Sequence, residues 1–287
     1  MIALSLPGNE GFAGRLGLPV HPVEVHTFPD GESRVRVDAP VAGEDVAVVC
    51  TLDRPDPKLL PVGFALQAAR DLGARRVVLV APYLCYMRQD RAFRPGEAVS
   101  ARVVAGLLSG WCDGLVTVDP HLHRIPSLRV LYAVPSTVVH AAPALSAWVR
   151  DNVRDPVVIG PDEESRQWAE EVARGAGAPS TVLRKTRRGD RDVEVTVPDL
   201  DLWTGCTPVL VDDIVSTART MAAAALHLRA AGTAPPVCAV VHALFAPGAD
   251  ETLRDAGVAR VVSCDTVPHP TNTIEVASHV ARALAGT

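Results

Sequence analysis

Two adjacent aspartates, Asp212 and Asp213, stand at the end of a hydrophobic run and precede a Ser/Thr segment and an alanine-rich stretch. A buried strand that leads into a helix N-terminus offers unpaired N–H groups and the positive end of the helix dipole, which favour a phosphate. Thr217 and Thr220 add hydroxyl donors. Because carboxylates repel phosphate, we expect the aspartates to bind sugar hydroxyls or a metal ion. The pattern predicts a site for a phosphorylated sugar, although an ordinary strand, turn and capped helix would contain the same residues.

Further polar segments occur at intervals along the chain. They are HTFPDGE at 26–32, YLCYMRQD at 83–90, VDPHLHR at 118–124, IGPDEESR at 159–166, LRKTRR at 183–188 and SCDTVP at 263–268. In order and in spacing, these segments resemble those of ribose-phosphate diphosphokinase, the synthetase of phosphoribosyl diphosphate (PRPP). The resemblance covers nearly the whole chain. The KTR segment and the DTVPHPTNT ending resemble the shorter, archaeal-type enzymes of that family.

Length and composition limit the remaining possibilities. The chain has 287 residues, enough for one large or two ordinary domains, and its net charge of −5 does not imply a general surface for nucleic acid or other polyanions. None of the six cysteines forms a CxxC pair, so we interpret them as reduced core residues. The N-terminus lacks the pattern of a signal peptide, and no stretch reaches the ~18 uncharged residues of a membrane span. We therefore expect a cytoplasmic protein without nucleic-acid or membrane partners.

Val/Leu-rich runs alternate with alanine-rich stretches of helical period. Strands are predicted at 45–50, 76–82, 115–119, 156–160, 208–212, 237–242 and 259–264. Helices are predicted at 60–72, 99–108, 142–149, 164–175, 217–231 and 274–285. Gly73, Gly175 and Gly232 stand where helix C-terminal glycines are expected. Because near-continuous apolar strands are buried on both faces, the pattern predicts an α/β fold with a mainly parallel sheet covered by helices.

The two halves of the chain show a similar pattern of strands and helices. In each half, polar residues follow the C-terminal ends of strands, where open α/β sheets bind ligands. We predict two domains, 1–142 and 143–287. The resemblance implies that both are phosphoribosyltransferase-like, the first on the ATP side and the second on the ribose 5-phosphate side. The segment 184–194 is polar and contains glycine, so it is predicted to be a mobile loop.

The resemblance implies that the C1 hydroxyl of ribose 5-phosphate attacks the β-phosphorus of ATP, giving PRPP and AMP. Such a reaction depends mainly on the alignment of the substrates and on charge neutralisation. The resemblance assigns the sugar hydroxyls to Asp212 and Asp213. It assigns the 5-phosphate to the loop formed by Ser216, Thr217, Ala218, Arg219 and Thr220.

The remaining assignments also follow from the resemblance. His121 and Asp162 are the expected ligands of Mg²⁺, and Lys185 and Arg187 the catalytic cations. The ATP-binding residues are Phe28, Asp30, Glu32, Arg88, Gln89 and Asp90. In related enzymes a neighbouring subunit completes part of this site, so a homo-oligomer of at least two chains is implied.

The phosphate loop departs from the family pattern. Ala218 and Arg219 stand where relatives carry glycine, so Ala218 would be strained if its position requires a positive φ. Arg219 either contacts the phosphate, which we favour, or points to solvent. Two alternatives remain open. A phosphoribosyltransferase that consumes PRPP would not need the segments at 26–32, 83–90 and 183–188, and a non-catalytic regulatory subunit typically loses loop cations or metal ligands.

Overall fold

The computed structural model describes residues 1–122, 124–187, 193–196, 203 and 205–286. The fold is α/β, as predicted, and the chain forms two compact units. The first unit comprises Met1–Val139, Thr266–Pro268 and Val276–Thr287, and the second comprises His140–Asp265 and His269–Glu275. These units differ from the division predicted at 142/143, because the last helix of the chain packs on the first sheet.

Among the described residues, the first unit contains a seven-stranded sheet. Its strands, in spatial order, are β3 (Ser33–Val37), β2 (Val20–Thr27), β1 (Ile2–Ser5), β4 (Asp45–Val49), β5 (Arg76–Ala81), β6 (Gly114–Val118) and β7 (Ser136–Val139). Neighbouring strands are parallel except β2 and β3, which form an antiparallel hairpin at the edge. The central strands β1, β4, β5 and β6 are almost entirely buried, as expected for a sheet covered on both faces.

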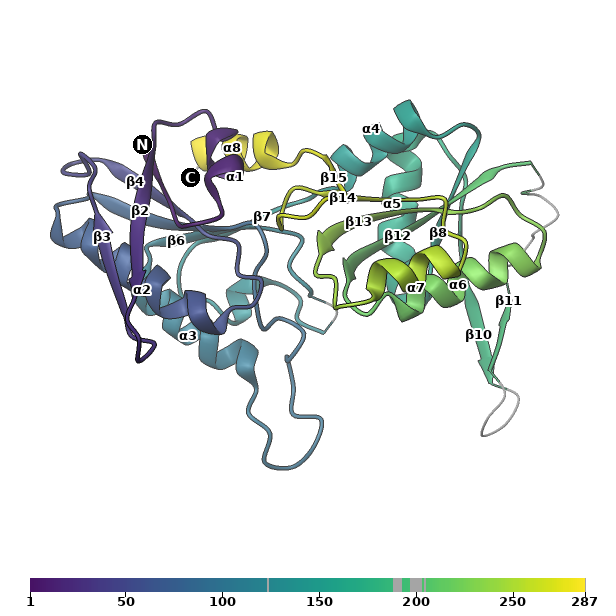
Figure 1. Ribbon diagram of the computed structural model, residues 1–287, viewed down its shortest axis with the longest axis horizontal. Helices are drawn as coiled ribbons and strands as arrows, with labels where there is room; N and C mark the ends of the chain where they lie inside the picture. Colours follow the sequence, from purple (N-terminus) through teal and green to yellow (C-terminus); the bar gives the residue numbers. More distant parts are fainter. Residues whose placement is uncertain (123, 188–192, 197–202, 204, 287) are drawn as a thin grey trace. The chain divides into compact units, whose positions relative to one another are not determined.

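Helices cover both faces of this sheet (Figure 1). They are α1 (Glu10–Gly14), α2 (Asp56–Asp71), α3 (Ser100–Trp111) and α8 (Ala277–Ala285), with a short 3₁₀ turn, η1, at Leu128–Val130. Helices α2 and α3 pack against each other, whereas α8 contacts β6 and β7. In the described part of the chain, no helix has the length and apolar character needed to cross a membrane.

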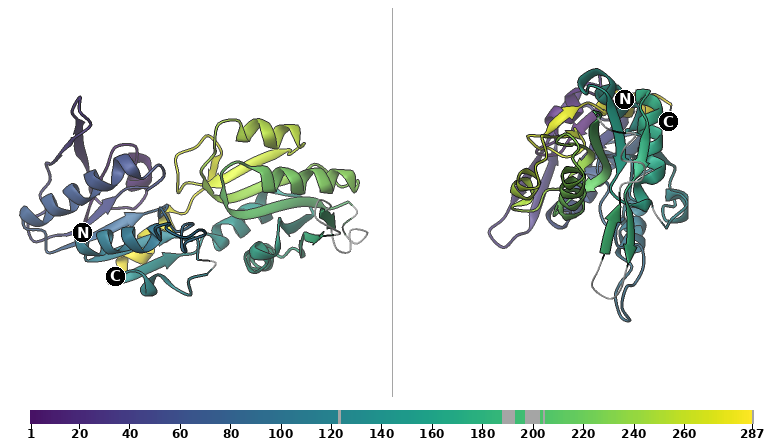
Figure 2. Two further views of the ribbon diagram at one scale, coloured as in Figure 1. Left: turned by 90° about the horizontal axis from the view of Figure 1, so that it is seen from below. Right: turned by 90° about the vertical axis from the view of Figure 1, so that its right-hand side faces the viewer.

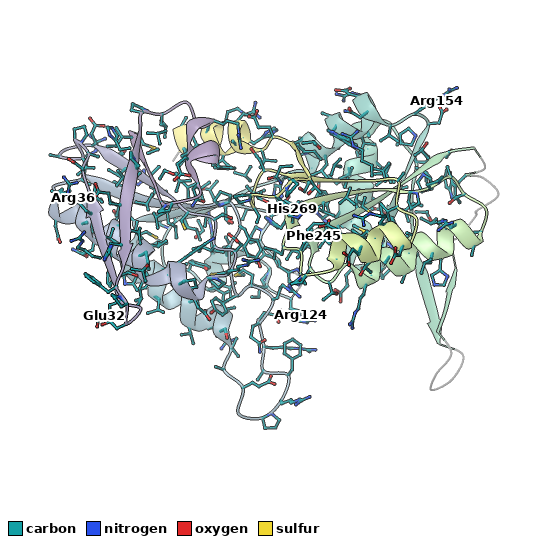
Figure 3. The ribbon with its side chains drawn as sticks, in the orientation of Figure 1. Glu32, Arg36, Arg124, Arg154, Phe245 and His269 are labelled. Carbon is teal, nitrogen blue, oxygen red and sulfur yellow. The ribbon has the colours of Figure 1, made fainter. Side chains whose placement is uncertain are left out.

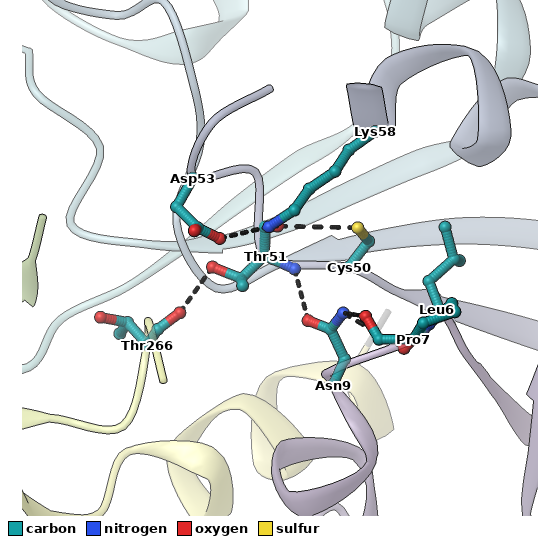
Figure 4. Close-up of polar contacts among 8 residues, drawn as sticks. All are labelled: Leu6, Pro7, Asn9, Cys50, Thr51, Asp53, Lys58 and Thr266. Atoms are coloured by element: carbon teal, nitrogen blue, oxygen red, sulfur yellow. Dashed lines mark hydrogen bonds and ion pairs between the residues drawn. The ribbon is translucent and has the colours of Figure 1, made fainter. Parts of the chain in front are cut away.

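A buried polar network around Thr51 attaches the 266–268 segment to the first unit (Figure 4). The Thr51 hydroxyl donates to the Thr266 carbonyl at 2.6 Å, and the Thr51 N–H donates to Asn9 Oδ1 at 2.7 Å. Lys58 donates to the Thr51 carbonyl at 3.1 Å and forms an ion pair with Asp53. Because buried polar groups are costly when unpaired, this network fixes the carboxyl end of β4.

The second unit contains a six-stranded sheet within the described residues. Its strands, in spatial order, are β15 (Asn272–Ile274), β14 (Arg260–Cys264), β13 (Val237–Ala243), β12 (Thr207–Val215), β8 (Pro156–Gly160) and β9 (Ser180–Val182). All of these neighbours are parallel. Since both sheets are mainly parallel and flanked by helices, the predicted fold class is confirmed.

Helices α4 (Ala142–Asn152) and α5 (Arg166–Ala176) pack together in the second unit, as do α6 (Arg219–Ala230) and α7 (Ala249–Asp255). Figure 2 shows the two pairs on opposite faces of the sheet. A 3₁₀ turn, η2 (Glu163–Ser165), precedes α5. All six cysteines of the chain are free thiols.

Two local predictions were wrong. Gly175 lies inside α5, and the left-handed residue that ends this helix is Gly177, with φ +68°. A Cβ on Gly175 would lie 2.5 Å from Ser146 Oγ, so glycine is required there for close packing of α4 and α5. Part of the segment predicted as a mobile loop at 184–194 is strand: 184–187 form β10 (Arg184–Arg187) and 193–194 begin β11 (Val193–Thr196), and the two strands pair antiparallel. Residues 188–192 of that segment lie outside the described residues. The β-branched valines and threonines of β10 and β11 favour strands.

Candidate functional site

The two aspartates lie within β12 and not at its end, so the predicted end of that strand was wrong. Strand β12 pairs with β8 only as far as Leu210, but it continues beside β13 to Val215. The β13 ladder holds this extension in strand conformation after β8 has ended. On its β8 side, β12 therefore has no strand partner beyond Leu210 among the described residues, and the η2 turn that follows β8 contacts β12.

Asp212 lies in a strongly anionic environment. Burial of its carboxyl group raises its pKa well above the ordinary value, and the charges of Asp213 and Asp162 raise it further. The Asp213 N–H donates to Asp212 Oδ1 at 3.0 Å and only partly offsets this effect. The structure thus brings together Asp212, Asp213 and Asp162, which the sequence assigned to the sugar and metal sites. A cation or several hydroxyl donors beside them would favour the ionised form.

The Asp162 side chain is held in place by a capping box. Its Oδ1 accepts from the Ser165 N–H at 3.2 Å, and Ser165 Oγ accepts from the Asp162 N–H at 3.3 Å. Ser165 Oγ also donates to the Asp162 carbonyl at 2.7 Å. A Cβ on Gly160 would lie 2.5 Å from Ser165 Oγ, so glycine is required where β8 turns into this cap. The cap uses Oδ1 and leaves Oδ2 for another ligand.

The predicted phosphate loop connects β12 to α6. Ser216 and Thr217 form a bend, and Ala218 precedes the helix with φ +61° and ψ 1°. Its position therefore does require a positive φ, which is unfavourable for alanine. Arg219 and Thr220 begin the helix with exposed side chains. Since no described side chain caps α6, its first-turn N–H groups remain available to an anion.

A stacked pair that the sequence analysis missed lies next to this loop. The N–H groups of Leu244 and Ala246 donate to the carbonyls of Val215 and Ser216 at 2.9 and 3.0 Å. Between them, the Phe245 ring stacks on His269, with centroids 4.4 Å apart and an interplanar angle of 11° (Figure 3).

Hydrogen bonds hold the His269 ring. His269 Nδ1 lies 2.8 Å from Thr271 Oγ1, which lies 2.7 Å from Ser263 Oγ, and Asn272 Nδ2 donates to Ser263 Oγ at 2.9 Å. The PHPTNT run that follows β14 was the available signal in the sequence, because it combines a histidine with polar neighbours.

In the first unit, the FPDGE segment forms the tip of the β2–β3 hairpin. The Phe28 N–H donates to the Glu32 carbonyl at 2.7 Å, and the Glu32 N–H donates to Asp30 Oδ1 at 3.1 Å. The tight turn therefore exposes Phe28, Asp30 and Glu32 together, and Figure 3 marks its position at Glu32. The Phe28 side chain is 39% exposed and contacts His26 edge-on.

The RQD segment follows β5 and presents its side chains unequally. Arg88 is exposed, whereas the Asp90 side chain is only 3% exposed. Asp90 Oδ1 and Oδ2 accept from Arg124 Nη1 at 3.1 and 3.3 Å. The Arg124 guanidinium also lies 6.0 Å from the Phe93 ring. Arg124 was not singled out from the sequence, although it ends the VDPHLHR segment; it is labelled in Figure 3.

His121 and Asp162 belong to different units. His121 is half-buried and follows a turn in which Asp119 has φ +30° and donates its N–H to Val139 O at 3.0 Å. Over the described ranges, no group of three or more His, Cys, Asp and Glu residues is arranged to hold a metal ion. Lys185 and Arg187 lie in β10, opposite Val195 and Val193 of β11.

Known proteins resemble this chain along its whole length. Residues 9–111 match the N-terminal domain of ribose phosphate pyrophosphokinase, and residues 133–279 match the phosphoribosyl transferase domain. The chain is 40% identical to a ribose-phosphate pyrophosphokinase of Methanopyrus kandleri, covering 95% of this chain and 93% of that protein. It is 36% identical to the ribose-phosphate pyrophosphokinase of Methanothermobacter thermautotrophicus, with 94% and 93% covered.

A solved structure is similar over the same extent. The phosphoribosylpyrophosphate synthetase from Mycobacterium smegmatis superimposes with a TM-score of 0.85 at 26% identity, covering 99% of this chain and 97% of that one. The sequence matches, the fold and the order of the motifs agree with one another. The chain belongs to the ribose-phosphate pyrophosphokinase family, as its motifs predicted.

Proposed function

We propose that the chain carries out its family's reaction, in which the diphosphoryl group of ATP is transferred to the C1 hydroxyl of ribose 5-phosphate, with the residues assigned from its motifs. The observation that supports this assignment best is the convergence of Asp162, Asp212 and Asp213 beside an uncapped helix start. A sugar phosphate has hydroxyls for the carboxylates and an anion for the helix. A sugar phosphate therefore complements both the carboxylates and the helix N-terminus.

For the sugar end, we assign the ribose hydroxyls to Asp212 and Asp213, which accept hydrogen bonds from them. The 5-phosphate is assigned to the N–H groups of the 216–220 loop and to the hydroxyls of Thr217 and Thr220. Two fixed contacts on opposite ends of the sugar restrict its rotation. The C1 hydroxyl is thereby oriented for in-line attack, which is the main contribution that a protein makes to such a transfer.

For the metal, Asp162 and His121 are the residues that would hold Mg²⁺. Asp162 fits this role because its cap fixes one carboxylate oxygen and leaves the other, in a cluster of three carboxylates whose charges repel one another. Mg²⁺ is commonly bound in proteins through one or two carboxylates together with water and substrate phosphates. When bound, it neutralises charge on the transferring diphosphoryl group.

For the nucleotide, we assign Phe28 to stack on the adenine, with Asp30 and Glu32 beside it, and Arg88 and Gln89 to contact the phosphates. Lys185 and Arg187 are assigned to the diphosphoryl group during transfer. The exposed tip of the β2–β3 hairpin supports completion of the ATP site by a second copy of the chain. Multi-angle light scattering would detect this homo-oligomer of at least two chains.

Calorimetry of Asp213→Asn tests the assignment of the sugar site. The asparagine side chain still accepts a hydrogen bond but lacks the charge and one of the two acceptor oxygens. We expect ribose 5-phosphate to bind about tenfold or more weakly while ATP binds as before. Asp151→Asn, on the exposed end of α4, is the control. Equal losses for both ligands would show that the sugar site is misplaced.

A further inference from the structure

Tyr86 has a backbone conformation that tyrosine seldom adopts. Its φ of +60° lies in the left-handed region, where an L-residue with a bulky side chain is strained. Such strain persists only where the surroundings hold it, and it concentrates at functional sites. Tyr86 stands two residues before Arg88, at the start of the turn that carries the RQD segment.

The side chain of Tyr86 provides one of these restraints. Its hydroxyl donates to Oδ1 of Asp56, the first residue of α2. Asp56 is suited to accept because the helix dipole favours a carboxylate at this end. The same hydrogen bond raises the pKa of Tyr86 to about 12, so the phenol remains a donor throughout the neutral range.

The backbone provides further restraints. The Gln89 N–H donates to the Tyr86 carbonyl at 3.0 Å and closes the turn, and the Ala101 N–H, near the start of α3, donates to the Gln89 carbonyl at 3.2 Å. Met87 is 1% exposed, whereas Arg88 is exposed. The turn is therefore held between the first turns of α2 and α3, with Met87 packed inside and Arg88 directed outward.

We propose that Tyr86 is a positioning residue for ATP: its hydrogen bond to Asp56 holds the left-handed turn that directs Arg88 and Gln89 toward the nucleotide phosphates. This inference rests on the proposed function, which assigns the RQD segment to ATP. Tyr86 itself need not touch the substrate. Without its hydroxyl, the strained turn loses a restraint, and Arg88 spends less time in the orientation that binds ATP.

The test is Tyr86→Phe, which removes only the hydroxyl. Because the hydrogen bond is solvent-exposed, we expect KM for ATP to rise about three- to tenfold, with kcat and KM for ribose 5-phosphate nearly unchanged. Asp56→Ala should give the same change, and the double variant should be no worse than either single variant. Tyr132→Phe is the matched control, because the buried Tyr132 hydroxyl has no partner among the described residues.

Arg88→Ala distinguishes a failure of the role proposed for Tyr86 from a failure of the assignment of the RQD segment to ATP. If it raises KM for ATP while Tyr86→Phe leaves it within 1.5-fold of wild type, the positioning role is refuted and the ATP site stands. If neither variant changes KM for ATP, the RQD segment does not bind ATP. Both its assignment to ATP and the positioning role of Tyr86 are then refuted. A Tyr86→Phe variant with lower stability and lower kcat but an unchanged KM for ATP would indicate a purely structural residue, which also overturns the inference.

Discussion

Asp212→Asn is expected to stabilise the folded protein while it impairs sugar binding. Burial and the charges of Asp213 and Asp162 oppose ionisation of Asp212. Asparagine resembles the protonated acid, since it retains Oδ1 as the acceptor for the Asp213 N–H and carries no charge. At neutral pH the substitution therefore removes the repulsion between the Asp212 carboxylate and those of Asp213 and Asp162. In the wild-type protein, bound Mg²⁺ and sugar hydroxyls are proposed to relieve this repulsion.

The magnitude follows from Coulomb's law. Two like charges about 5 Å apart at an effective dielectric constant of ~20 repel by about 3 kcal/mol. Protonation of wild-type Asp212 and ionic screening reduce this value, so we expect the free energy of unfolding to rise by about 1–3 kcal/mol at pH 8. Residues held in place for function commonly reduce stability in this way.

The pH dependence has a definite sign. The folded protein holds the Asp212 proton more tightly than the unfolded chain does, because the folded pKa is raised. The stability contributed by this group is present at low pH and is lost as pH rises from the unfolded pKa, near 4, through the folded pKa. The advantage of Asp212→Asn should accordingly be small near pH 4 and grow toward pH 8.

Urea unfolding followed by tryptophan fluorescence measures the free energy of unfolding of the second unit, which contains Asp212. Three of the four tryptophans lie in the second unit, namely Trp148, Trp168 and Trp203. Asp151→Asn is a control, since the Asp151 side chain is 63% exposed. Ribose 5-phosphate should stabilise wild type but not Asp212→Asn. A variant that is no more stable than wild type at pH 8, or whose advantage does not vary with pH, would refute the reasoning.

Three further predictions concern cations. Lys185→Ala should lower kcat by about 10²–10³ with little effect on stability, and a variant within tenfold of wild type would remove Lys185 from its role. Arg219→Gly should raise KM for ribose 5-phosphate roughly tenfold while KM for ATP stays constant; an unchanged or lower KM would mean that Arg219 points to solvent. Arg124→Gln should lower the free energy of unfolding by about 1–2 kcal/mol, because it leaves the buried Asp90 carboxylate without its ion pair. Asp90→Asn in the Arg124→Gln background should restore most of that loss, as measured by chemical denaturation.

Local patterns in the sequence were sufficient for the central elements of the fold. The apolar runs at β4, β5, β6, β8 and β13 are buried on both faces, so their strand character is visible without tertiary information. The edge hairpin β2–β3 is different, because its strands alternate between partly buried and exposed residues and carry several charges. Its two strands pair with each other at 23–27 and 33–37, and only the start of β2, at 20–22, pairs with β1.

In the candidate site, too, some features follow from the local sequence and others depend on tertiary contacts. The strain at Ala218 was anticipated from the sequence, because the family pattern places a glycine there. The end of β12 was not, since Val215 remains in a strand only because Ala243 of β13 pairs with it. Contacts between distant positions, such as Tyr86 with Asp56 and Arg124 with Asp90, leave no periodic signal in the sequence. They become visible only when the fold brings the two segments together.

The identity of the products tests the central claim most directly. The chain is incubated with ATP, Mg²⁺ and ribose 5-phosphate, and the nucleotides and sugar phosphates are separated by ion exchange and identified by ³¹P NMR. We expect AMP and PRPP in equal amounts, with no AMP when ribose 5-phosphate or Mg²⁺ is omitted and with a loss of about 10²-fold or more in Lys185→Ala. Formation of ADP, AMP release that does not require ribose 5-phosphate, or no turnover by a protein that binds both substrates would contradict the account.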